Sequence, residues 1–212
     1  MNMFIVFEGI DASGKETQAK LLAKALKKKG HKVYMVDFPN YKNPIGKMIK
    51  KFLDKKVELD VETRALLYAA DRRYELKGIT KALDDNKIVI ADRYCYSNIA
   101  YQGSLGANIS WLASLDATLV FPDLVFYLDI PAKESLRRRT RKDRYESKRE
   151  FLERVRETYT NMATGNMRPF EKYKDYAEWI TVDGTLPIDI IHKEILMQVE
   201  MRLPRGDDEW SD

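Results

Sequence analysis

One glycine-rich segment constrains the fold of this chain more than any other feature. It follows an apolar run at residues 4–7, precedes a helical pattern of leucines and alanines, and reads Gly9, Ile10, Asp11, Ala12, Ser13, Gly14, Lys15, Glu16, Thr17. Glycines let consecutive backbone amides point at phosphate oxygens at a helix N-terminus, and Lys15 can reach the β- and γ-phosphates. A plain turn between a strand and a helix would explain the glycines but not the lysine. The segment therefore predicts a phosphate-binding loop.

The loop departs from the usual motif at one position. The motif normally ends in Gly-Lys followed by Ser or Thr, whose hydroxyl binds Mg²⁺. Glu16 occupies that place in this chain, and Thr17 comes one step later. Mg²⁺ would then depend on another carboxylate, on phosphates and waters, or on Glu16 itself.

Apolar runs alternate with helical periodicity along the chain, a pattern typical of parallel βαβ units. Strands are expected at residues 4–8, 33–38, 88–92, 124–129 and 179–183. Helices are expected to begin near Lys15, near Ile45, after an Asp60 N-cap, after Pro131, near Lys148 and after Pro187. The prediction is one α/β domain over residues 1–204, a three-layer sandwich with a five-stranded parallel sheet flanked by helices. The acidic tail, residues 205–212, lacks any pattern and is expected to fray.

Composition narrows the class of protein. The chain has 212 residues, of which 44% are hydrophobic, enough for one sizeable core. Its net charge of +4 is nearly balanced and gives little support to nucleic-acid binding. A single cysteine, Cys95, excludes an intrachain disulfide, and no apolar run reaches membrane-spanning length. The opening residues read as a short strand and not as a secretory leader, so a cytoplasmic protein is expected, with no nucleic-acid or membrane partner.

A carboxylate and a guanidinium follow the third expected strand. Asp92 and Arg93 come at its carboxyl end, where ligands bind in open α/β folds. Asp92 could hold Mg²⁺, directly or through water, and Arg93 could grip a phosphate with a bidentate fork. The alternative is a surface ion pair. Asp129 also ends an apolar strand, but it precedes Ile130-Pro131 and is expected to cap the next helix, so the metal role is assigned to Asp92.

Four segments, taken in order, resemble one known family. They are the phosphate loop, Phe38-Pro39-Asn40-Tyr41, Leu67-Tyr68-Ala69-Ala70-Asp71-Arg72, and Asp92-Arg93-Tyr94-Cys95-Tyr96-Ser97-Asn98-Ile99-Ala100-Tyr101-Gln102-Gly103. From the first strand to the helix after Pro187, the chain resembles the thymidylate kinases. The resemblance implies a P-loop nucleoside monophosphate kinase that depends on Mg²⁺, transfers the γ-phosphoryl group of ATP to dTMP for dTTP synthesis, and forms a homodimer. It also implies that the first strand lies between the third and the fourth, which would bring Asp92 beside the loop.

The resemblance also assigns roles around the thymine base and its sugar. Tyr68 stands where the family usually has a Phe that stacks on the base, and Arg72 would hydrogen-bond a base carbonyl. Asn98 would read the ring N–H and the neighbouring carbonyl. Tyr101 would pack beneath the deoxyribose and crowd out a 2′-hydroxyl. Ordinary core packing is the alternative for the two tyrosines.

The remaining acceptor residues surround the phosphate of dTMP. Phe38, Tyr41 and Arg93 would enclose it, while Asp11 would touch the acceptor side near the sugar or the water shell of the metal. Gln102 is also assigned to substrate binding. Since the second pKa of a phosphate monoester is near 6, the attacking oxygen is already anionic near neutral pH and needs no catalytic base. The enzyme then has only to bring the two anions into line and to neutralise charge on the phosphoryl group in transfer.

A dense basic run at residues 137–144 is interpreted as a lid over ATP, near residues 137–147. The alternatives are a solvated face or a nucleic-acid patch. Some family members have an arginine where this chain has Ala12, and those without it take the catalytic arginine from the lid. The candidates are Arg137, Arg139, Arg141 and Arg144, of which Arg141 and Arg144 are favoured beside Lys15, Asp11 and Arg93 as catalytic residues. Tyr145 resembles the lid tyrosine that lines the acceptor pocket.

Three rival functions are weighed against this interpretation. A deoxynucleoside kinase needs a carboxylate base just after the second strand, and residues 38–41 contain none. A GTP-binding regulator would normally carry an Asn-Lys-x-Asp segment, which the sequence lacks. A nucleic-acid-binding ATPase would use the basic run and bind polynucleotide with steep salt dependence. The choice between dTMP and dUMP stays open, because burial of one methyl group is worth only about 0.8 kcal/mol.

Overall fold

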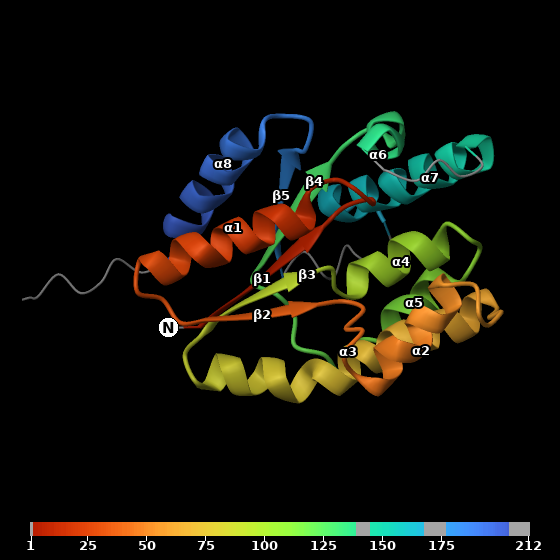
Figure 1. Cartoon of the computed structure of the whole chain (residues 1–212), viewed down its shortest axis with the longest axis horizontal. Helices are drawn as coiled ribbons and strands as arrows, with labels where there is room; N and C mark the ends of the chain where they lie inside the picture. Colours follow the sequence, from red (N-terminus) through yellow and green to blue (C-terminus); the bar gives the residue numbers. More distant parts are fainter. Residues whose placement is uncertain (1, 139–144, 168–176, 204–212) are drawn as a thin grey trace, which may run out of the picture.

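The computed structural model describes residues 2–138, 145–167 and 177–203 (Figure 1). Its five strands form one parallel sheet in the order β2-β3-β1-β4-β5. Their bounds are β1 Met3–Glu8, β2 Val33–Asp37, β3 Ile88–Asp92, β4 Leu124–Asp129 and β5 Glu178–Asp183. The expected parallel sheet is confirmed, and β1 lies between β3 and β4 as the family resemblance implies.

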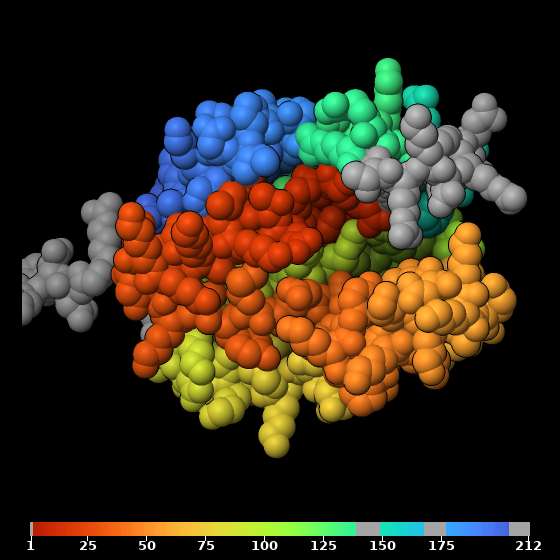
Figure 2. All heavy atoms as spheres, viewed as in Figure 1, coloured from red at the N-terminus to blue at the C-terminus, as the bar shows by residue number. Residues whose placement is uncertain are grey.

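Helices cover both faces of this sheet, which confirms the three-layer sandwich (Figure 1). Their bounds are α1 Lys15–Lys28, α2 Pro44–Leu53, α3 Val61–Asp84, α4 Cys95–Gly103, α5 Ile109–Ser114, α6 Ala132–Arg138, α7 Tyr145–Thr164 and α8 Ile188–Glu200. One face packs against α1 and α8, and the other against α3, α4, α5 and α7. In the space-filling view, α1 and α2 spread over the near face, and α8 runs along one edge (Figure 2).

The alternation of side chains along β1 explains the two cores. Ile5 and Phe7 point into the core beneath α1 and α8, whereas Phe4 and Val6 point into the opposite core. All six residues of this central strand are buried. A strand covered by helices on both faces must be apolar at successive positions, which is why its sequence shows a continuous apolar run.

Several helix ends follow local sequence signals. The Asp60 side chain accepts a hydrogen bond from the Thr63 amide at 2.6 Å, so the expected N-cap of α3 is confirmed. Gly30 adopts a positive φ of 90° just after α1, in keeping with the expected helix end. The expected helices do not include α4 and α5, which lie between β3 and β4. None of the helices in the described ranges has the length and apolar character needed to cross a bilayer.

The expected capping role of Asp129 is wrong. Its carboxylate instead forms a bidentate pair with Arg156 of α7, with Nε–Oδ1 and Nη2–Oδ2 distances of 2.7 and 2.8 Å, and also accepts the Tyr127 hydroxyl. The guanidinium satisfies both carboxylate oxygens more strongly than a neutral backbone amide would. The basic segment 139–144 and the tail 205–212 lie outside the described residues.

Candidate active site

The phosphate loop joins the end of β1 to the start of α1. Gly9, Ala12 and Gly14 all have positive φ, and a Cβ on Gly9 would meet the Leu128 carbonyl oxygen at 2.5 Å. Glycine at position 9 is therefore required by both conformation and space. Lys15 is buried and donates to the Ile10 carbonyl at 2.7 Å, so its ammonium lies over the loop where phosphates would bind. Burial, with the nearby charge of Arg93, lowers the pKa of Lys15 to about 7.

Asp92 lies beside this loop, since it pairs in register with Phe7 of β1. Its Oδ1 is buried and has no hydrogen-bond partner within the described residues. Burial raises the pKa of Asp92, although Lys15 and Arg93 lower it. Glu16 lies on the exposed side of α1 and pairs with Lys20. An unsatisfied carboxylate oxygen fits Mg²⁺, which typically takes one or two carboxylates together with waters and phosphates. The described residues contain no cluster of three metal-ligating side chains.

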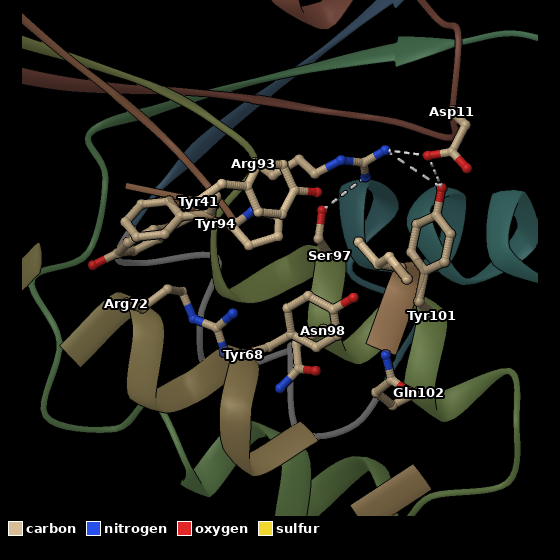
Figure 3. Close-up of a pocket in the computed structure, with 13 residues that line it drawn as sticks. Asp11, Tyr41, Tyr68, Arg72, Arg93, Tyr94, Ser97, Asn98, Tyr101 and Gln102 are labelled. Atoms are coloured by element: carbon tan, nitrogen blue, oxygen red, sulfur yellow. Dashed lines mark hydrogen bonds and ion pairs between the residues drawn. The ribbon is translucent and has the colours of Figure 1, made fainter. Parts of the chain in front are cut away.

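Arg93 is the cation that joins the loop to α4. It has a positive φ of 68°, and its Nη1 donates to the Gly9 carbonyl at 3.2 Å and to the Ser97 hydroxyl at 3.0 Å. Its Nη2 donates to Asp11 Oδ1 at 2.6 Å, and the Tyr101 hydroxyl donates to the same oxygen at 3.0 Å (Figure 3). The Asp11 side chain is 44% exposed and that of Arg93 18% exposed. The pair therefore faces an open cavity from the loop side.

A buried carboxylate that the sequence analysis missed supports this arrangement. Glu8 accepts hydrogen bonds from the Tyr94 amide at 2.8 Å and the Ser97 amide at 3.2 Å, which satisfies two backbone donors at the N-terminus of α4. Its other oxygen accepts the hydroxyls of Ser97 and Tyr159 at 2.7 and 2.8 Å. Burial raises the pKa of Glu8, although these hydrogen bonds lower it. The only sequence signal was a carboxylate that ends an apolar strand.

A cavity of about 270 Å³ extends from Asp11 and Arg93 toward α3 (Figure 3). Nearly the whole predicted acceptor set lines it: Asp11, Phe38, Tyr41, Tyr68, Arg72, Arg93, Asn98, Tyr101 and Gln102. Leu53, Pro39, Tyr94 and Ser97 also line it and were not assigned from the sequence. The structure thus brings the predicted acceptor residues of four separate segments to one cavity.

The end of the cavity opposite Arg93 contains a second arginine, which is more buried and pairs with a buried carboxylate. Arg72 is only 2% exposed, and its Nε and Nη2 donate to the two carboxylate oxygens of Asp116 at 2.9 and 2.6 Å. Asp116 is 4% exposed and lies just after α5. No sequence signal indicated this partner, since Asp116 lies 44 residues from Arg72 in a stretch without a recognisable motif.

Two amide oxygens of residues that line the cavity are unsatisfied. Asn98 Nδ2 donates to the Ala65 carbonyl at 3.1 Å, while its Oδ1 and the Oε1 of Gln102 are buried without a partner in the described part of the chain. Buried acceptors of this kind call for a donor from a ligand or water. Tyr68 lies across this end of the cavity, half-buried, and burial raises its pKa to about 12, so its hydroxyl stays protonated near neutral pH.

A second hollow lies on the other side of the phosphate loop. It is lined by Ala12, Ser13, Gly14, Thr17, Gln18, Arg138, Gly184, Leu186, Pro187, Ile188 and Ile191. Arg138, which was not among the candidate lid arginines, donates to the Gly184 carbonyl at 2.9 Å and the Ala12 carbonyl at 3.4 Å. Arg137 is exposed and pairs with Glu134. The candidates Arg139, Arg141 and Arg144 lie outside the described residues, as does the side chain of Tyr145.

Comparisons with known proteins give a consistent result. The family model described as thymidylate kinase matches residues 7–195. A probable thymidylate kinase of Thermococcus gammatolerans is 38% identical, with 97% of this chain and 100% of the relative covered. The thymidylate kinase of Plasmodium falciparum is 37% identical, with 92% and 89% covered. A probable thymidylate kinase of Methanococcus aeolicus is 41% identical, with 94% and 96% covered.

Proposed function

Because this chain belongs to the thymidylate kinase family, we propose how its residues divide the work of phosphoryl transfer. The enzyme transfers the γ-phosphoryl group of ATP to dTMP, giving dTDP and ADP for dTTP synthesis. It must bring two anions together and neutralise charge on the group in transfer. The two hollows on either side of the phosphate loop supply one compartment for each nucleotide.

ATP occupies the loop and the hollow beside α8. The amides of residues 9–17 surround its phosphates at the N-terminus of α1, and the Lys15 ammonium lies against the β- and γ-phosphates. Arg138 borders the same hollow and contributes positive charge there. Asp92 would hold Mg²⁺ through its unsatisfied oxygen, with Glu16 as the weaker candidate because it pairs with Lys20. When bound, the ion would neutralise charge between the β- and γ-phosphates.

The phosphate of dTMP binds at Arg93. Its guanidinium already faces the cavity beside the loop, and Asp11 and Ser97 fix the direction of the two arms. An incoming phosphate oxygen competes with Asp11 for the Nη2 donor, so Asp11 aligns Arg93 before substrate arrives. Phe38 and Tyr41 close the phosphate end. No side chain needs to remove a proton, since the attacking phosphate oxygen is already ionised.

The base and sugar occupy the deeper part of the cavity. Tyr68 stacks on the pyrimidine ring, the free N–H groups of Arg72 donate to its 4-carbonyl, and the unsatisfied oxygen of Asn98 accepts the ring N–H. Gln102 adds a second acceptor nearby. Tyr101 packs beneath the deoxyribose and leaves no room for a 2′-hydroxyl.

Four further features stay proposals. A lid near residues 137–147 carries the catalytic arginine, Arg141 or Arg144, and Tyr145 lines the acceptor pocket from it. We propose one domain over residues 1–204 that includes this lid; the tail at 205–212 lies outside the described residues. The enzyme is a homodimer, by resemblance to the family. It acts in the cytoplasm without nucleic-acid partners, in keeping with its nearly balanced charge.

The single observation that carries this proposal is one cavity lined both by a phosphate-competent arginine and by unsatisfied amide oxygens. The test is ADP production from ATP and Mg²⁺ with dTMP, dUMP, dCMP, dGMP and thymidine offered separately. We expect kcat/KM to be highest for dTMP. Equal use of all the monophosphates would contradict the assigned base contacts, and turnover of thymidine alone would contradict the assigned phosphate contact.

A further inference from the structure

The most buried charged pair at the candidate site is the Arg72–Asp116 pair. Its two side chains come from α3 and from the connection between α5 and β4, and neither is more than 4% exposed. Asp116 takes no part in the function proposed above. Its geometry nevertheless bears on how the base is selected, because Arg72 lines the acceptor cavity.

The contact fixes which donors Arg72 can offer. A guanidinium has five N–H donors in a rigid planar fork. The Nε hydrogen and one Nη2 hydrogen are taken by Asp116 in a bidentate arrangement. Three N–H donors remain, two on Nη1 and one on Nη2. Since the fork is planar, fixing one edge fixes the direction of the remaining donors as well.

Asp116 is itself held in place by the backbone. Its amide donates to the Ala113 carbonyl at 3.4 Å, and its carbonyl accepts the Leu119 amide at 3.0 Å, so it sits inside a turn. The carboxylate therefore comes from a backbone position that is held in place, and it binds the Arg72 guanidinium from an element outside α3. A flexible arginine on α3 alone would have several rotamers with different donor directions.

The pair also sets the charge at this end of the cavity. An isolated buried cation would be costly, and it would attract a phosphate as readily as a base carbonyl. Burial lowers the pKa of Arg72, but the charge and hydrogen bonds of Asp116 raise it above its ordinary value, so the group stays cationic. With Asp116 opposite, the pair is neutral as a whole. This end of the cavity is thus suited to an uncharged ring with exposed acceptors.

We propose that Asp116 is a positioning residue for base selection: it holds Arg72 by Nε and Nη2 so that the remaining N–H donors face the 4-carbonyl of thymine and disfavour the 4-amino group of cytosine. The inference rests on the proposed role of Arg72. Cytosine presents N–H donors where thymine presents an oxygen, so donors would meet donors. A site built to hydrogen-bond one polar group discriminates strongly against a ligand that leaves its buried groups unpaired.

The test compares kcat/KM for dTMP with kcat/KM for dCMP in Asp116→Asn. We expect the dTMP/dCMP ratio to fall about tenfold or more, mainly through a higher KM for dTMP, with kcat largely kept because Arg93 and Lys15 are untouched. The matched control is Asp129→Asn, which weakens the bidentate Asp129–Arg156 pair away from the acceptor cavity. It should leave the ratio unchanged. An unchanged ratio in folded Asp116→Asn would overturn the proposal.

A double-mutant cycle separates positioning from a structural role. Arg72→Gln alone tests the proposed base contact: if it leaves the ratio unchanged, the role of Arg72 fails regardless of Asp116. If Arg72→Gln lowers the ratio, adding Asp116→Asn should change it by less than twofold, because Asp116 acts only through Arg72. A further drop of tenfold in the double variant would show that Asp116 acts by another route.

A second substitution keeps the proposal testable if Asp116→Asn does not fold. Asp116→Glu keeps the charge but moves the carboxylate outward by one methylene, which redirects the guanidinium. We expect this variant to lower the dTMP/dCMP ratio as well, with a circular dichroism spectrum like that of the parent. A folded Asp116→Glu enzyme with the parent ratio would overturn the proposal.

Discussion

The two arginines of the acceptor cavity differ in how their charge is held. Arg72, at the end proposed for the base, forms an ion pair with the carboxylate of Asp116, which is almost as buried as the guanidinium. Arg93, at the phosphate end, shares its donors among a backbone carbonyl, a hydroxyl and the half-exposed Asp11. The first arrangement neutralises the cation and leaves only its directional donors for use. The second places a cation beside the loop with more exposed partners, which we propose an incoming phosphate displaces.

From this difference we infer that burial and pairing, more than residue type, decide what each arginine recognises. A guanidinium paired along one edge with a buried carboxylate offers its remaining donors in fixed directions to a neutral group, whereas one whose partners are more exposed can exchange them for an anion. The two arginines also differ in backbone conformation. Arg72 lies inside a regular helix, but Arg93 has a positive φ at the β3–α4 junction and depends on Glu8 and Ser97 for its position.

The largest expected effect is on the phosphate end. Arg93→Ala should lower kcat/KM for dTMP by about 10³-fold, because the acceptor phosphate loses the cation that binds it and positions it for attack. Steady-state ADP release is the measurement. Arg202→Ala, which removes an arginine paired with Glu178 on the surface, should retain the parent rate. Near-parent turnover in Arg93→Ala would refute the clamp.

A smaller effect should follow from the ammonium of Lys15. Burial lowers its pKa to about 7 in the free enzyme, and bound phosphates favour the charged form, so ATP binding should take up a proton above that pH. The affinity for ATP should then weaken about tenfold between pH 7 and pH 8.5. Calorimetry in buffers of different ionisation enthalpy measures the uptake. Lys20→Met should keep this uptake, and its absence in the parent enzyme would contradict the role of Lys15.

Tyr101, which lines the cavity, is proposed to pack beneath the deoxyribose. Tyr101→Ala should lower the preference for dUMP over UMP about tenfold, since a smaller side chain leaves room for the 2′-hydroxyl. The exposed Tyr74 on α3 offers a matched control, and Tyr74→Ala should keep the parent preference. If the deoxy-to-ribo ratio is the same in Tyr101→Ala and the parent, the residue does not exclude the ribose.

The smallest expected effect concerns the hydroxyl of Tyr68. Tyr68→Phe should change kcat/KM for dTMP by less than about threefold, because the aromatic face proposed to stack on the base is retained. The pKa of this hydroxyl is about 12, so it does not ionise near neutral pH and contributes no charge. A loss of more than tenfold would mean that the hydroxyl itself binds the substrate.

The sequence predicted those parts of the fold and site whose sequence signals lie close to the residues concerned. The strands, the loop and the cap at Asp60 each have a signal within a few residues, and the acceptor residues occur in recognisable segments. Asp116 and Glu8 were missed because their partners are distant in sequence and are brought near only by packing. Asp129 was misassigned for the same reason, since its partner Arg156 follows 27 residues later in α7.

The most direct test of the division between the two arginines is to measure kcat/KM for dTMP and dCMP in Arg72→Gln and Arg93→Gln side by side. We predict that Arg72→Gln lowers the dTMP/dCMP ratio while retaining most of kcat. Arg93→Gln should lower turnover of both substrates by a similar factor and leave the ratio intact. If Arg93→Gln alters the ratio and Arg72→Gln lowers both rates equally, the two arginines do not divide base and phosphate recognition.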